Sequence, residues 1–489
     1  MLGPIKSALL LLSVTGALLG TTGASATAAA PDLRVVGSEI RDQSTGTEFI
    51  PRGVNWPSFE YACVQGWGYS NLGATRDTAE AMLEWKINTV RIPLNQDCWL
   101  GDDDQPRNEL FGPELTPVGY RNAVAAFVGI LRDAGIAVIL DLHWTGRQGT
   151  IADGLRPMAD NRSDDFWISV ASRFSTEPSV IFDLFNEPHS RWDPAAQRWA
   201  FEQTWHCWTH GGCTAPDQPD TETVIDGSTY QTVGMKTLVD AVRSTGATQP
   251  IILGGLDYAN DLRGWKNAAP ADGQLIAGFH NYPGKPCGTN ACWNGVIAAL
   301  ARNVPVLTAE VGQNDCQATF ISRYMDWADR HGIGYLAWAW WDLSGTILDP
   351  GPGCSNFALI EDLDGTPTPA YGAAFKEHLQ HPLDEEPEPP PPPEPEAARL
   401  SIVSALVRGR KVRATFRINP LATGRLVIHQ MSVKGRRGRK IRATAPIRMG
   451  RSQVVMPVRR GWKPKRIFVS YPGSELVLSG KSNRRLKGG

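Results

Sequence analysis

Eight short apolar segments recur along the first 340 residues of the chain, and they limit its fold more than any other feature of the sequence. They start at Glu48, Asn88, Ala137, Val180, Pro250, Leu275, Val304 and Gly334. Nearly unbroken hydrophobicity is typical of strands that are buried on both faces, as they are in a parallel sheet. The pattern therefore predicts parallel strands that are covered on both sides by other elements.

Stretches with helical periodicity separate these segments. One, from Val124 to Leu131, places its apolar side chains on a single face, and another begins at Ser163 with two aspartates in its first turn. Eight strand–helix units in roughly 350 residues predict a (β/α)8 barrel. A doubly wound open sheet is the alternative, because periodicity alone does not distinguish the two folds.

A segment rich in proline and glutamate, residues 383–396, divides the chain into a long part and a short part. Its composition is typical of a stiff, extended linker of polyproline type. We therefore expect a signal peptide over residues 1–30, a barrel domain over 31–382, the linker, and a second domain over 397–489. The second domain holds 24 of the 49 Lys and Arg residues and a single acidic one, Glu475. Parts that differ so much in charge should meet different partners.

The basic domain, residues 397–489, contains about seven short alternating runs that end with residues 474–480. Such runs, separated by Gly, Pro, Asn or basic turns, predict a small all-β sandwich, with an immunoglobulin-like arrangement as the working hypothesis. Lys434–Lys440 concentrates cations in a predicted turn. Binding to an anionic cell-surface polymer is one interpretation of this charge, and a solvated spacer domain is the other.

The N-terminus has the pattern of a signal peptide, with Lys6, the apolar run Ala8–Leu19, and small residues before residue 31. An uncleaved N-terminal anchor is the alternative. The apolar run is too short to span a bilayer as a mature helix, and no other stretch is longer. We expect a secreted, extracellular protein without a transmembrane segment, retained at the cell wall if the basic domain binds there.

The eight cysteines fit export, because an even number in an exported chain favours disulfides over free buried thiols. The chain contains no Cys-x-x-Cys pair, which argues against a zinc site. Eight cysteines allow 105 pairings, so adjacency of loops is the only guide to connectivity. It suggests the pairs Cys63–Cys98, Cys207–Cys213, Cys287–Cys292 and Cys316–Cys354.

Polar side chains end several of the apolar segments, where a barrel places its catalytic groups. They are Arg91, His143, Asn186, Glu187, His280, Tyr282 and Glu310, and the last segment ends with Trp338 and Trp340. A buried strand that ends in a carboxylate is costly unless that group is paired or used. Each glutamate alone could serve as an ion-pair partner. Together, at the ends of the fourth and seventh segments, they suggest the acid and the nucleophile of glycoside hydrolysis.

From about Val54 to Leu379 the chain resembles glycoside hydrolase family 5, the cellulase-like family of the wider (β/α)8 hydrolase clan. The resemblance implies that Glu187, in the Asn-Glu-Pro motif, is the acid/base and that Glu310 is the nucleophile. It implies that Asn186 binds the sugar 2-hydroxyl. It also implies that five further residues bind the substrate or support catalysis: Arg91, His143, His280, Tyr282 and Trp338. Trp340 is the alternative to Trp338. The residues around Glu310, Ala-Glu-Val-Gly, depart from the family's usual Gly-Glu-Phe-Gly and leave the subfamily open.

A retaining mechanism needs two carboxyl groups about 5–5.5 Å apart, one ionised and one protonated. We expect Arg91 and Tyr282 to keep Glu310 ionised, and the nearby Glu310 carboxylate to raise the pKa of Glu187. Further side chains that follow strands are candidates for sugar subsites, with core packing as the alternative for the aromatic ones. These are Trp56, Phe59, Glu60, Trp144, Asp257, Trp265 and Trp340.

The sequence is best interpreted as a secreted, retaining endo-β-1,4-glucanase acting on β-linked polysaccharide or oligosaccharide. The family to which it is similar also contains mannanases, β-1,3- and β-1,6-glucanases, xyloglucanases and enzymes that cleave glycolipids. Two rivals come from another class: a carbohydrate-binding pseudoenzyme, and a cell-wall binding protein whose basic domain is its main function. No metal cluster, P-loop or dinucleotide motif is found, so no cofactor is expected, and export makes nucleic acid an unsuitable partner.

Overall fold

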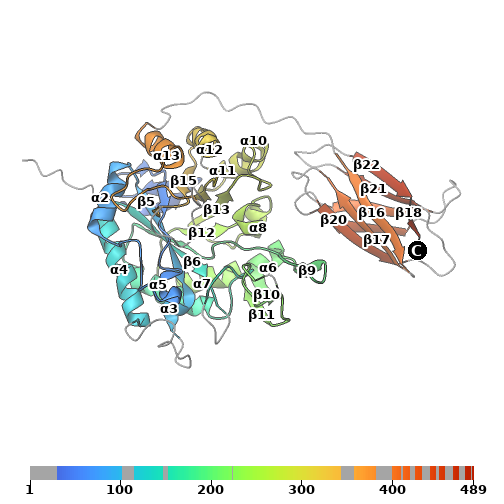
Figure 1. The fold of residues 1–489 in the computed structure, drawn as a ribbon, viewed down its shortest axis with the longest axis horizontal. Helices are drawn as coiled ribbons and strands as arrows, with labels where there is room; N and C mark the ends of the chain where they lie inside the picture. Colours follow the sequence, from blue (N-terminus) through green and yellow to red (C-terminus); the bar gives the residue numbers. More distant parts are fainter. Residues whose placement is uncertain are drawn as a thin grey trace, which may run out of the picture.

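The computed structural model describes two domains, which are shown in Figure 1. In the long part it describes residues 30–101, 115–146, 152–222, 224–315, 317–342 and 357–381. In the basic domain it describes residues 399–408, 411–418, 425–431, 441–447, 451–457, 466–472, 480–485 and 487–488.

Eight parallel strands close into a barrel, in the order β4-β5-β6-β7-β12-β13-β14-β15. Their bounds are β4 Arg52–Asn55, β5 Thr89–Asn95, β6 Ala137–Trp144, β7 Val180–Asp183, β12 Ile251–Gly254, β13 Leu275–Asn281, β14 Val306–Val311 and β15 Gly334–Ala337. Each strand coincides with one of the eight apolar segments. The predicted (β/α)8 barrel is therefore confirmed, and the open sheet is excluded because β15 pairs with β4.

Helices encircle these strands in Figure 1. The longer ones are α2 Arg76–Glu84, α4 Pro117–Asp133, α5 Ser163–Phe174, α7 Met235–Ser244, α12 Thr319–Asp329 and α13 Tyr371–Gln380. The shorter ones are α1 Ala62–Gln65, α3 Gln96–Leu100, α6 Trp205–His210, α8 Leu256–Ala259, α9 Trp265–Ala268, α10 Asn290–Cys292, the π-helix η2 Trp293–Ile297 and α11 Ala298–Ala301. The apolar face predicted from Val124 to Leu131 is the buried face of α4. The side chain of Thr116 accepts a hydrogen bond from the backbone N–H of Gly119, which caps the start of that helix.

Alternation along the strands divides the barrel residues into two cores. In β6, Val138 and Leu140 pack toward the helices, whereas Ala137 and Ile139 join an interior cluster with residues of five other barrel strands. Because side chains alternate with a period of two, Asp141 and His143 continue the interior series. The barrel interior is thus apolar toward the N-terminal ends of the strands and polar toward their C-terminal ends.

A small sheet that the sequence did not predict covers the N-terminal end of the barrel. It consists of β1 Leu33–Val36, β2 Glu39–Asp42 and β3 Thr47–Glu48 in antiparallel order. Leu33 and Ile40 belong to the interior cluster of the barrel, and the backbone N–H of Leu33 donates to the carbonyl of Pro178. This sheet closes the end of the barrel opposite the polar residues.

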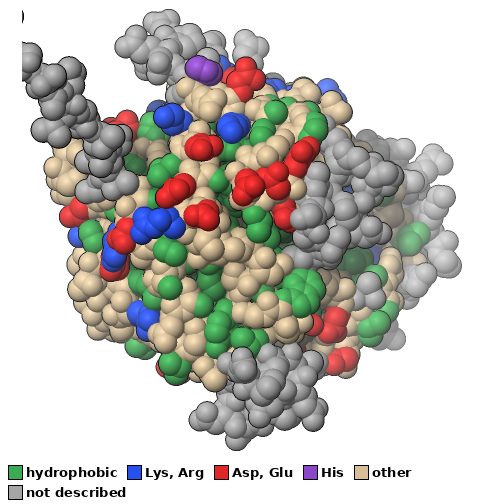
Figure 2. Space-filling view, turned by 60° about the vertical axis from the view of Figure 1, so that its left-hand side comes forward, with side chains coloured by type: hydrophobic (Ala, Val, Ile, Leu, Met, Phe, Trp, Pro, Cys, Tyr) green, Lys and Arg blue, Asp and Glu red, His purple; other side chains and the backbone are tan. Residues whose placement is uncertain are grey.

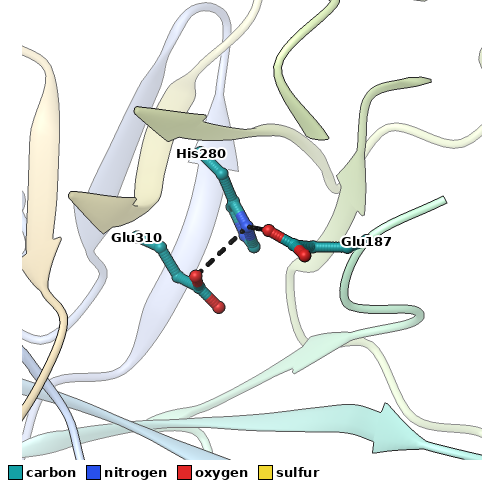
Figure 3. Close-up of side chains that lie close together, drawn as sticks. All are labelled: Glu187, His280 and Glu310. Atoms are coloured by element: carbon teal, nitrogen blue, oxygen red, sulfur yellow. Dashed lines mark hydrogen bonds and ion pairs between the residues drawn. The ribbon is translucent and has the colours of Figure 1, made fainter. Parts of the chain in front are cut away.

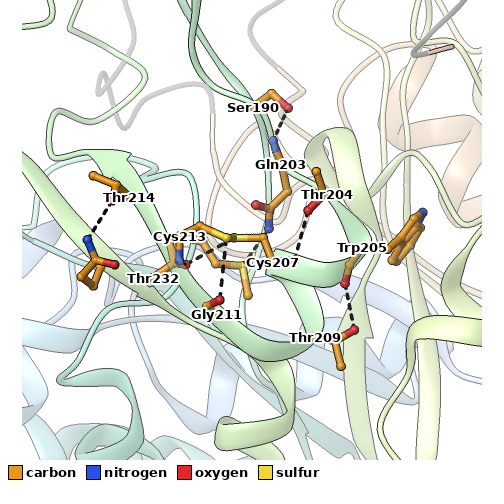
Figure 4. The surroundings of a disulfide bond; sticks show 12 residues. Ser190, Gln203, Thr204, Trp205, Cys207, Thr209, Gly211, Cys213, Thr214 and Thr232 are labelled. Carbon is orange, nitrogen blue, oxygen red and sulfur yellow. Dashed lines mark hydrogen bonds between the residues drawn. A yellow bond between two sulfur atoms is a disulfide. The ribbon is translucent and has the colours of Figure 1, made fainter. Parts of the chain in front are cut away.

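Two hairpins, also not predicted, follow the fourth barrel strand. The first is β8 Arg191–Asp193 with β9 Arg198–Phe201, and the second is β10 Gly211–Pro216 with β11 Thr229–Val233. Helix α6 lies between them in the chain, and a disulfide joins its Cys207 to Cys213 of β10, as Figure 4 shows.

Three of the four expected disulfides are present. Cys63–Cys98, Cys207–Cys213 and Cys287–Cys292 have Cα–Cα distances of 6.4, 6.0 and 5.1 Å. These separations lie within the range that the bond requires. The fourth expected pair, Cys316–Cys354, lies outside the described residues.

The basic domain consists of two four-stranded sheets with the orders β20-β17-β16-β23 and β19-β18-β21-β22. The strands are β16 Ser401–Arg408, β17 Lys411–Arg417, β18 Arg425–Met431, β19 Ile441–Pro446, β20 Arg451–Pro457, β21 Arg466–Tyr471, β22 Gly480–Arg485 and β23 Lys487–Gly488. Six of the seven predicted strands are present. The last one was expected over residues 474–480, most of which lie outside the described residues, and the structure instead has β22 and β23 after them. The predicted sandwich is nonetheless confirmed, because both sheets contribute to one apolar core.

The surface of the barrel domain shows the acidic excess expected from its sequence. On the face drawn in Figure 2, Asp and Glu side chains gather in the upper half with fewer Lys and Arg side chains among them. Among the described residues, no helix combines the length and the apolar character that crossing a bilayer requires.

Candidate active site

Arg91 of β5 is the fully buried centre of the polar end of the barrel. Its Nη1 donates to Glu310 Oε1 at 2.9 Å, its Nη2 to Asn186 Oδ1 at 2.8 Å, and its Nε to Asp183 Oδ2 at 2.9 Å. Asp141 Oδ2 lies 3.1 Å from the same guanidinium. Side chains from the third, fourth and seventh barrel strands therefore meet on one cation of the second strand.

Three carboxyl groups share this guanidinium, so its charge compensates them only in part. Burial raises the pKa of Asp141 to about 7 and that of Asp183 well above its usual range, while the charge of Arg91 opposes both shifts. The surrounding carboxylates raise the pKa of Arg91 in turn, against the effect of burial. Such a network fixes the positions of its members, because removal of one partner would leave a buried charge uncompensated.

Glu310 points into the barrel because β14 contains a bulge. Opposite β13, Thr308 pairs with Phe279 and Glu310 pairs with the next residue, His280, so β14 has one extra residue at Ala309. The pairing with β15 shifts over the same stretch. Strict alternation after the interior residue Leu307 would direct Glu310 toward the helices. The bulge re-aims it toward Arg91, as bulges beside functional sites often do.

Two further groups hold the Glu310 carboxylate. The hydroxyl of Tyr282, which follows β13, donates to Oε2 at 2.6 Å, and His280 Nδ1 lies 3.4 Å from the same oxygen. Arg91 occupies the other oxygen, so the carboxylate accepts hydrogen bonds at both ends. These contacts fix the orientation of the Glu310 carboxylate at the mouth of the barrel.

Glu187 follows β7 at the opposite side of the same opening. Its Oε1 lies 2.9 Å from His280 Nδ1, and its side chain is 14% exposed. The pKa of Glu187 is raised to about 7 as expected, but the main cause is burial and not the charge of Glu310; the positive charges of Lys285 and Arg91 oppose the shift, and Asp220 adds to it. Burial also lowers the pKa of His280 to about 3, so this imidazole is neutral near pH 7.

His280 stands between the two glutamates, as Figure 3 shows. One oxygen of each carboxyl group and one ring nitrogen of His280 all lie within 4.8 Å of one another. One glutamate is thus held by a cation and donors, while the other is buried with a raised pKa. Two carboxyl groups with such different environments can divide the roles of nucleophile and proton donor.

Two side chains of the third barrel strand, β6, lie beside Asn186. His143 Nδ1 lies 2.6 Å from Asp141 Oδ2, its Nε2 lies 3.5 Å from Asn186 Nδ2, and burial lowers its pKa to about 4. The ring of Trp338 stacks on His143 with 5.5 Å between ring centroids and 10° between planes. Trp338 is partly exposed, and its peptide bond to Ala339 is cis.

A stack of side chains supports the backbone of Glu187. His189 Nδ1 lies 2.8 Å from the carbonyl oxygen of Glu187, and its ring stacks on Tyr258 with centroids 4.4 Å apart. The ammonium of Lys285 lies 4.5 Å from the centroid of the same Tyr258 ring. Tyr258 belongs to a turn in which Asp257, Tyr258 and Ala259 all have left-handed φ angles, between 54° and 62°. Non-glycine residues adopt this conformation at a cost in conformational energy, and such turns persist only where the surrounding contacts hold them. The contacts of Tyr258 with His189 and Lys285 are of this kind.

Four predicted subsites are wrong because the structure buries their side chains. Trp56 and Phe59 pack against each other in the main core, where Trp56 also contacts Phe127. The indole N–H of Trp265 donates to the carbonyl of Leu253, and Trp340 packs on Trp85. Trp340 is therefore not an alternative to Trp338.

The remaining subsite candidates have mixed outcomes. Glu60 is buried, its carboxylate accepts from the backbone N–H of Ser58, and burial raises its pKa to about 8, so its role is local. Trp144 and Asp257 are partly exposed at the C-terminal ends of their strands, which leaves their assignment as a prediction.

Several residues of the site were not predicted from the sequence. Asn55 of β4 accepts a hydrogen bond from Arg91, and Asp141, Asp183 and His189 were not considered. A signal for Asp141 was present, because it lies two residues before His143 and so shares its side of the strand. The sequence gives no comparable signal for Lys285, which reaches the site from the loop after β13.

Comparisons with known proteins show what this chain is similar to. A family model described as Cellulase (glycosyl hydrolase family 5) matches residues 43–344. A beta-glucanase from Saccharophagus degradans, solved in its native form and in complex with cellotetraose, is 20% identical over 73% of this chain and 94% of its own, with a TM-score of 0.51. An endocellulase from the archaeon Pyrococcus horikoshii is 17% identical over 72% of this chain and 100% of its own, with a TM-score of 0.49. At these identities, the likeness of the beta-glucanase concerns the fold.

Proposed function

Because this chain belongs to glycosyl hydrolase family 5 and is thus a glycoside hydrolase, we propose that it is an exported endo-β-1,4-glucanase that retains anomeric configuration. The observation that carries the proposal is the pair Glu187 and Glu310, whose carboxyl oxygens approach within 4.8 Å. Retaining enzymes have carboxyl groups about 5–5.5 Å apart, whereas inverting enzymes need about 6.5–9.5 Å to admit a water molecule.

In the first step, a carboxylate oxygen of Glu310 attacks the anomeric carbon and forms a glycosyl ester. The bond to the leaving oxygen breaks, and that oxygen takes the proton of Glu187. In the second step, Glu187 removes a proton from water, the water oxygen attacks the anomeric carbon, and Glu310 leaves as a carboxylate. Two displacements restore the original configuration.

The surroundings of the two glutamates suit this exchange of roles. Arg91 and Tyr282 hold Glu310 as the anion that attacks. Once Glu310 is esterified, Glu187 has given its proton to the leaving oxygen, and its carboxylate is available as a base for water. His280 contacts both carboxyl groups and, as a neutral ring, can exchange a hydrogen bond with Glu187 in either protonation state.

The sugar that undergoes attack would lie against Asn186 and Trp338. The amide oxygen of Asn186 is occupied by Arg91, which leaves its NH₂ group to donate to the sugar 2-hydroxyl. That hydrogen bond strengthens as positive charge develops on the sugar ring. The exposed part of Trp338, fixed by stacking on His143, offers a flat apolar surface to the sugar face.

The preference for β-1,4-glucan rests on the description of the family and on the beta-glucanase of similar fold that was solved with cellotetraose. A panel of cellulose derivatives, mannan, β-1,3- and β-1,6-glucans, xyloglucan and glycolipids tests it. Fastest cleavage of β-1,4-glucan, with an early rise in reducing ends and fall in viscosity, is expected. Faster cleavage of another member of the panel would replace the glucanase assignment, and initial release of the opposite anomer would exclude retention.

The activity should fall as pH rises through about 7, because Glu187 must carry its proton to act as the acid. Lys285→Met removes a positive charge that opposes the raised pKa of Glu187. The pKa should then rise further, and the alkaline limb of the pH profile of kcat/KM should move to higher pH. Lys285→Arg keeps the charge and should leave the limb in place. An unmoved limb in the Met variant would show that Lys285 does not act on Glu187.

We propose export from the signal-peptide pattern of residues 1–30 and from the disulfides, which form in oxidising compartments. Sequencing of the N-terminus of protein recovered from the culture medium tests this. A start near residue 31 is expected. Recovery of the intact leader with the membrane fraction would contradict it.

We also propose that the basic domain retains the enzyme on an anionic cell-wall polymer. The outward side chains of β17 and its neighbour β20 include Lys411, Arg413, Arg417 and Arg451, which are all exposed. Among the described residues, this sheet contains no acidic side chain. A one-signed surface of this kind attracts polyanions at low salt.

Retention on anionic wall material should therefore be strong at low salt and should weaken as salt rises, since screening shortens the range of the attraction. In the full-length protein, the triple variant Lys411→Glu, Arg413→Glu, Arg417→Glu should lose most of this retention. Its rate on a small soluble substrate is the control for an intact barrel. Retention on cellulose that does not respond to salt, with none on the anionic material, would reverse the proposal.

A further inference from the structure

Two exposed tryptophans lie side by side on the hairpin β8–β9. Trp192 is 37% exposed and Trp199 is 44% exposed. They are cross-strand partners, and their rings lie 5.2 Å apart at 80°, so one ring presents its face where the other presents its edge. No function described above uses them. Exposed apolar surface of this kind often marks a binding site.

The hairpin is held rigidly at its base. The guanidinium of Arg191 donates to the carbonyls of Asp220 at 3.2 Å and Pro219 at 3.1 Å, and also to that of Glu222. The backbone N–H of Gln203 donates to Ser190 Oγ at 2.8 Å. Figure 4 shows this Ser190–Gln203 contact beside the Cys207–Cys213 disulfide. A platform fixed in advance loses little conformational entropy when a ligand binds.

We infer that the hairpin lies on the side of the opening that receives the leaving group, because it follows Glu187 closely in the chain. It begins four residues after Glu187, which protonates the leaving oxygen in the proposed mechanism. Five residues of extended chain span at most about 18 Å, so Trp192 lies within a few sugar units of Glu187. In Figure 1, β9 projects outward from the barrel past α6. A polysaccharide that continues from the cleavage point toward this side would meet the two rings.

We propose that Trp192 and Trp199 form a platform that binds the leaving-group portion of a long β-glucan chain. This inference rests on the proposed function, because it takes Glu187 as the acid. Indole rings can stack on the apolar faces of pyranose rings, and the flanking polar side chains Asp193 and Arg198 can bond to sugar hydroxyls. The platform would favour attack within a chain, since only a substrate that extends several units beyond the cleaved bond reaches it.

The test compares two substrates in the full-length protein. One is soluble β-1,4-glucan polymer, and the other is a nitrophenyl cello-oligosaccharide whose small leaving group cannot reach the hairpin. The double variant Trp192→Ala, Trp199→Ala should lose about tenfold or more in kcat/KM on the polymer. Its kcat/KM on the nitrophenyl substrate should stay close to that of the wild type.

Two further variants separate stacking from folding. Trp192→Tyr with Trp199→Phe keeps flat rings and should restore most of the loss. Trp67→Ala removes an indole of similar exposure, 45%, from the loop after β4, and it should not reproduce the selective loss on polymer. An equal loss on both substrates, or no loss on polymer, in the hairpin double variant would overturn the platform while leaving the glucanase proposal intact. A wild-type enzyme that cleaves neither substrate would instead overturn the glucanase proposal, and the platform with it.

Discussion

Replacement of Glu310 by Gln is expected to lower turnover by at least about 10⁴-fold on every substrate. The amide keeps the shape of the side chain but cannot form the glycosyl ester, so the first displacement is lost. The amide oxygen can keep the hydrogen bond from Arg91, and the amide NH₂ can donate to the hydroxyl oxygen of Tyr282, so the fold should stay intact. Steady-state rates on polymer and on a nitrophenyl glycoside, together with the melting temperature, measure both effects.

Trapping identifies the attacking residue directly. A 2-deoxy-2-fluoro glycoside with a strongly activated leaving group should form an ester on Glu310, which peptide mapping by mass spectrometry locates. In Glu310→Ala, the vacated space can admit azide, which would attack from the same face and give the α-glycosyl azide by a single inversion. An ester on another residue would refute the assignment of Glu310 as the nucleophile.

Replacement of Glu187 by Ala should have an effect that depends on the leaving group. General acid help contributes about 10²–10⁴-fold, and a sugar alcohol needs it most. Hydrolysis of polymer should fall by about that factor, whereas ester formation from a dinitrophenyl glycoside should fall far less. Because the second step also lacks its base, the ester should accumulate and KM should decrease.

Azide provides the matching control for Glu187. It needs no general base, so it should restore turnover of the activated substrate in Glu187→Ala and give the β-glycosyl azide. The two alanine variants are thus distinguished by the configuration of their products. An equal loss on all leaving groups, without rescue by azide, would assign Glu187 a structural role.

The sequence predicted the barrel well because its strands are buried on both faces. In β6, one face packs on helices and the other fills the barrel, so Val138 and Ile139 must both be apolar. The additions to the barrel were not predictable in the same way. Hairpins such as β8–β9 are short, exposed and irregular, and their sequences carry no continuous apolar run.

The sequence indicated several of the side chains that meet at the opening of the barrel, but it did not indicate their geometry. The positions of Glu187 and Glu310 at strand ends were readable, yet strict alternation would have turned Glu310 away from Arg91. The extra residue Ala309 turns the Glu310 side chain toward Arg91. The local sequence contains no pattern that predicts this bulge. The prediction that aromatic residues in the loops form sugar subsites was wrong for a related reason. Trp56 and Trp265 follow strands as subsite residues do, but only the packing shows that their indoles face the core.

The sheet at the N-terminal end of the barrel has a consequence for handling the protein. It seals the interior with Leu33 and Ile40, so the chain enters the domain at the end opposite Glu187 and Glu310. A tag or chemical tether attached at the expected start of the exported protein, near residue 31, would lie on the side of the barrel away from the catalytic opening. An enzyme immobilised in this orientation should keep its access to insoluble or polymeric material, whereas attachment through the hairpin β8–β9 would obstruct it.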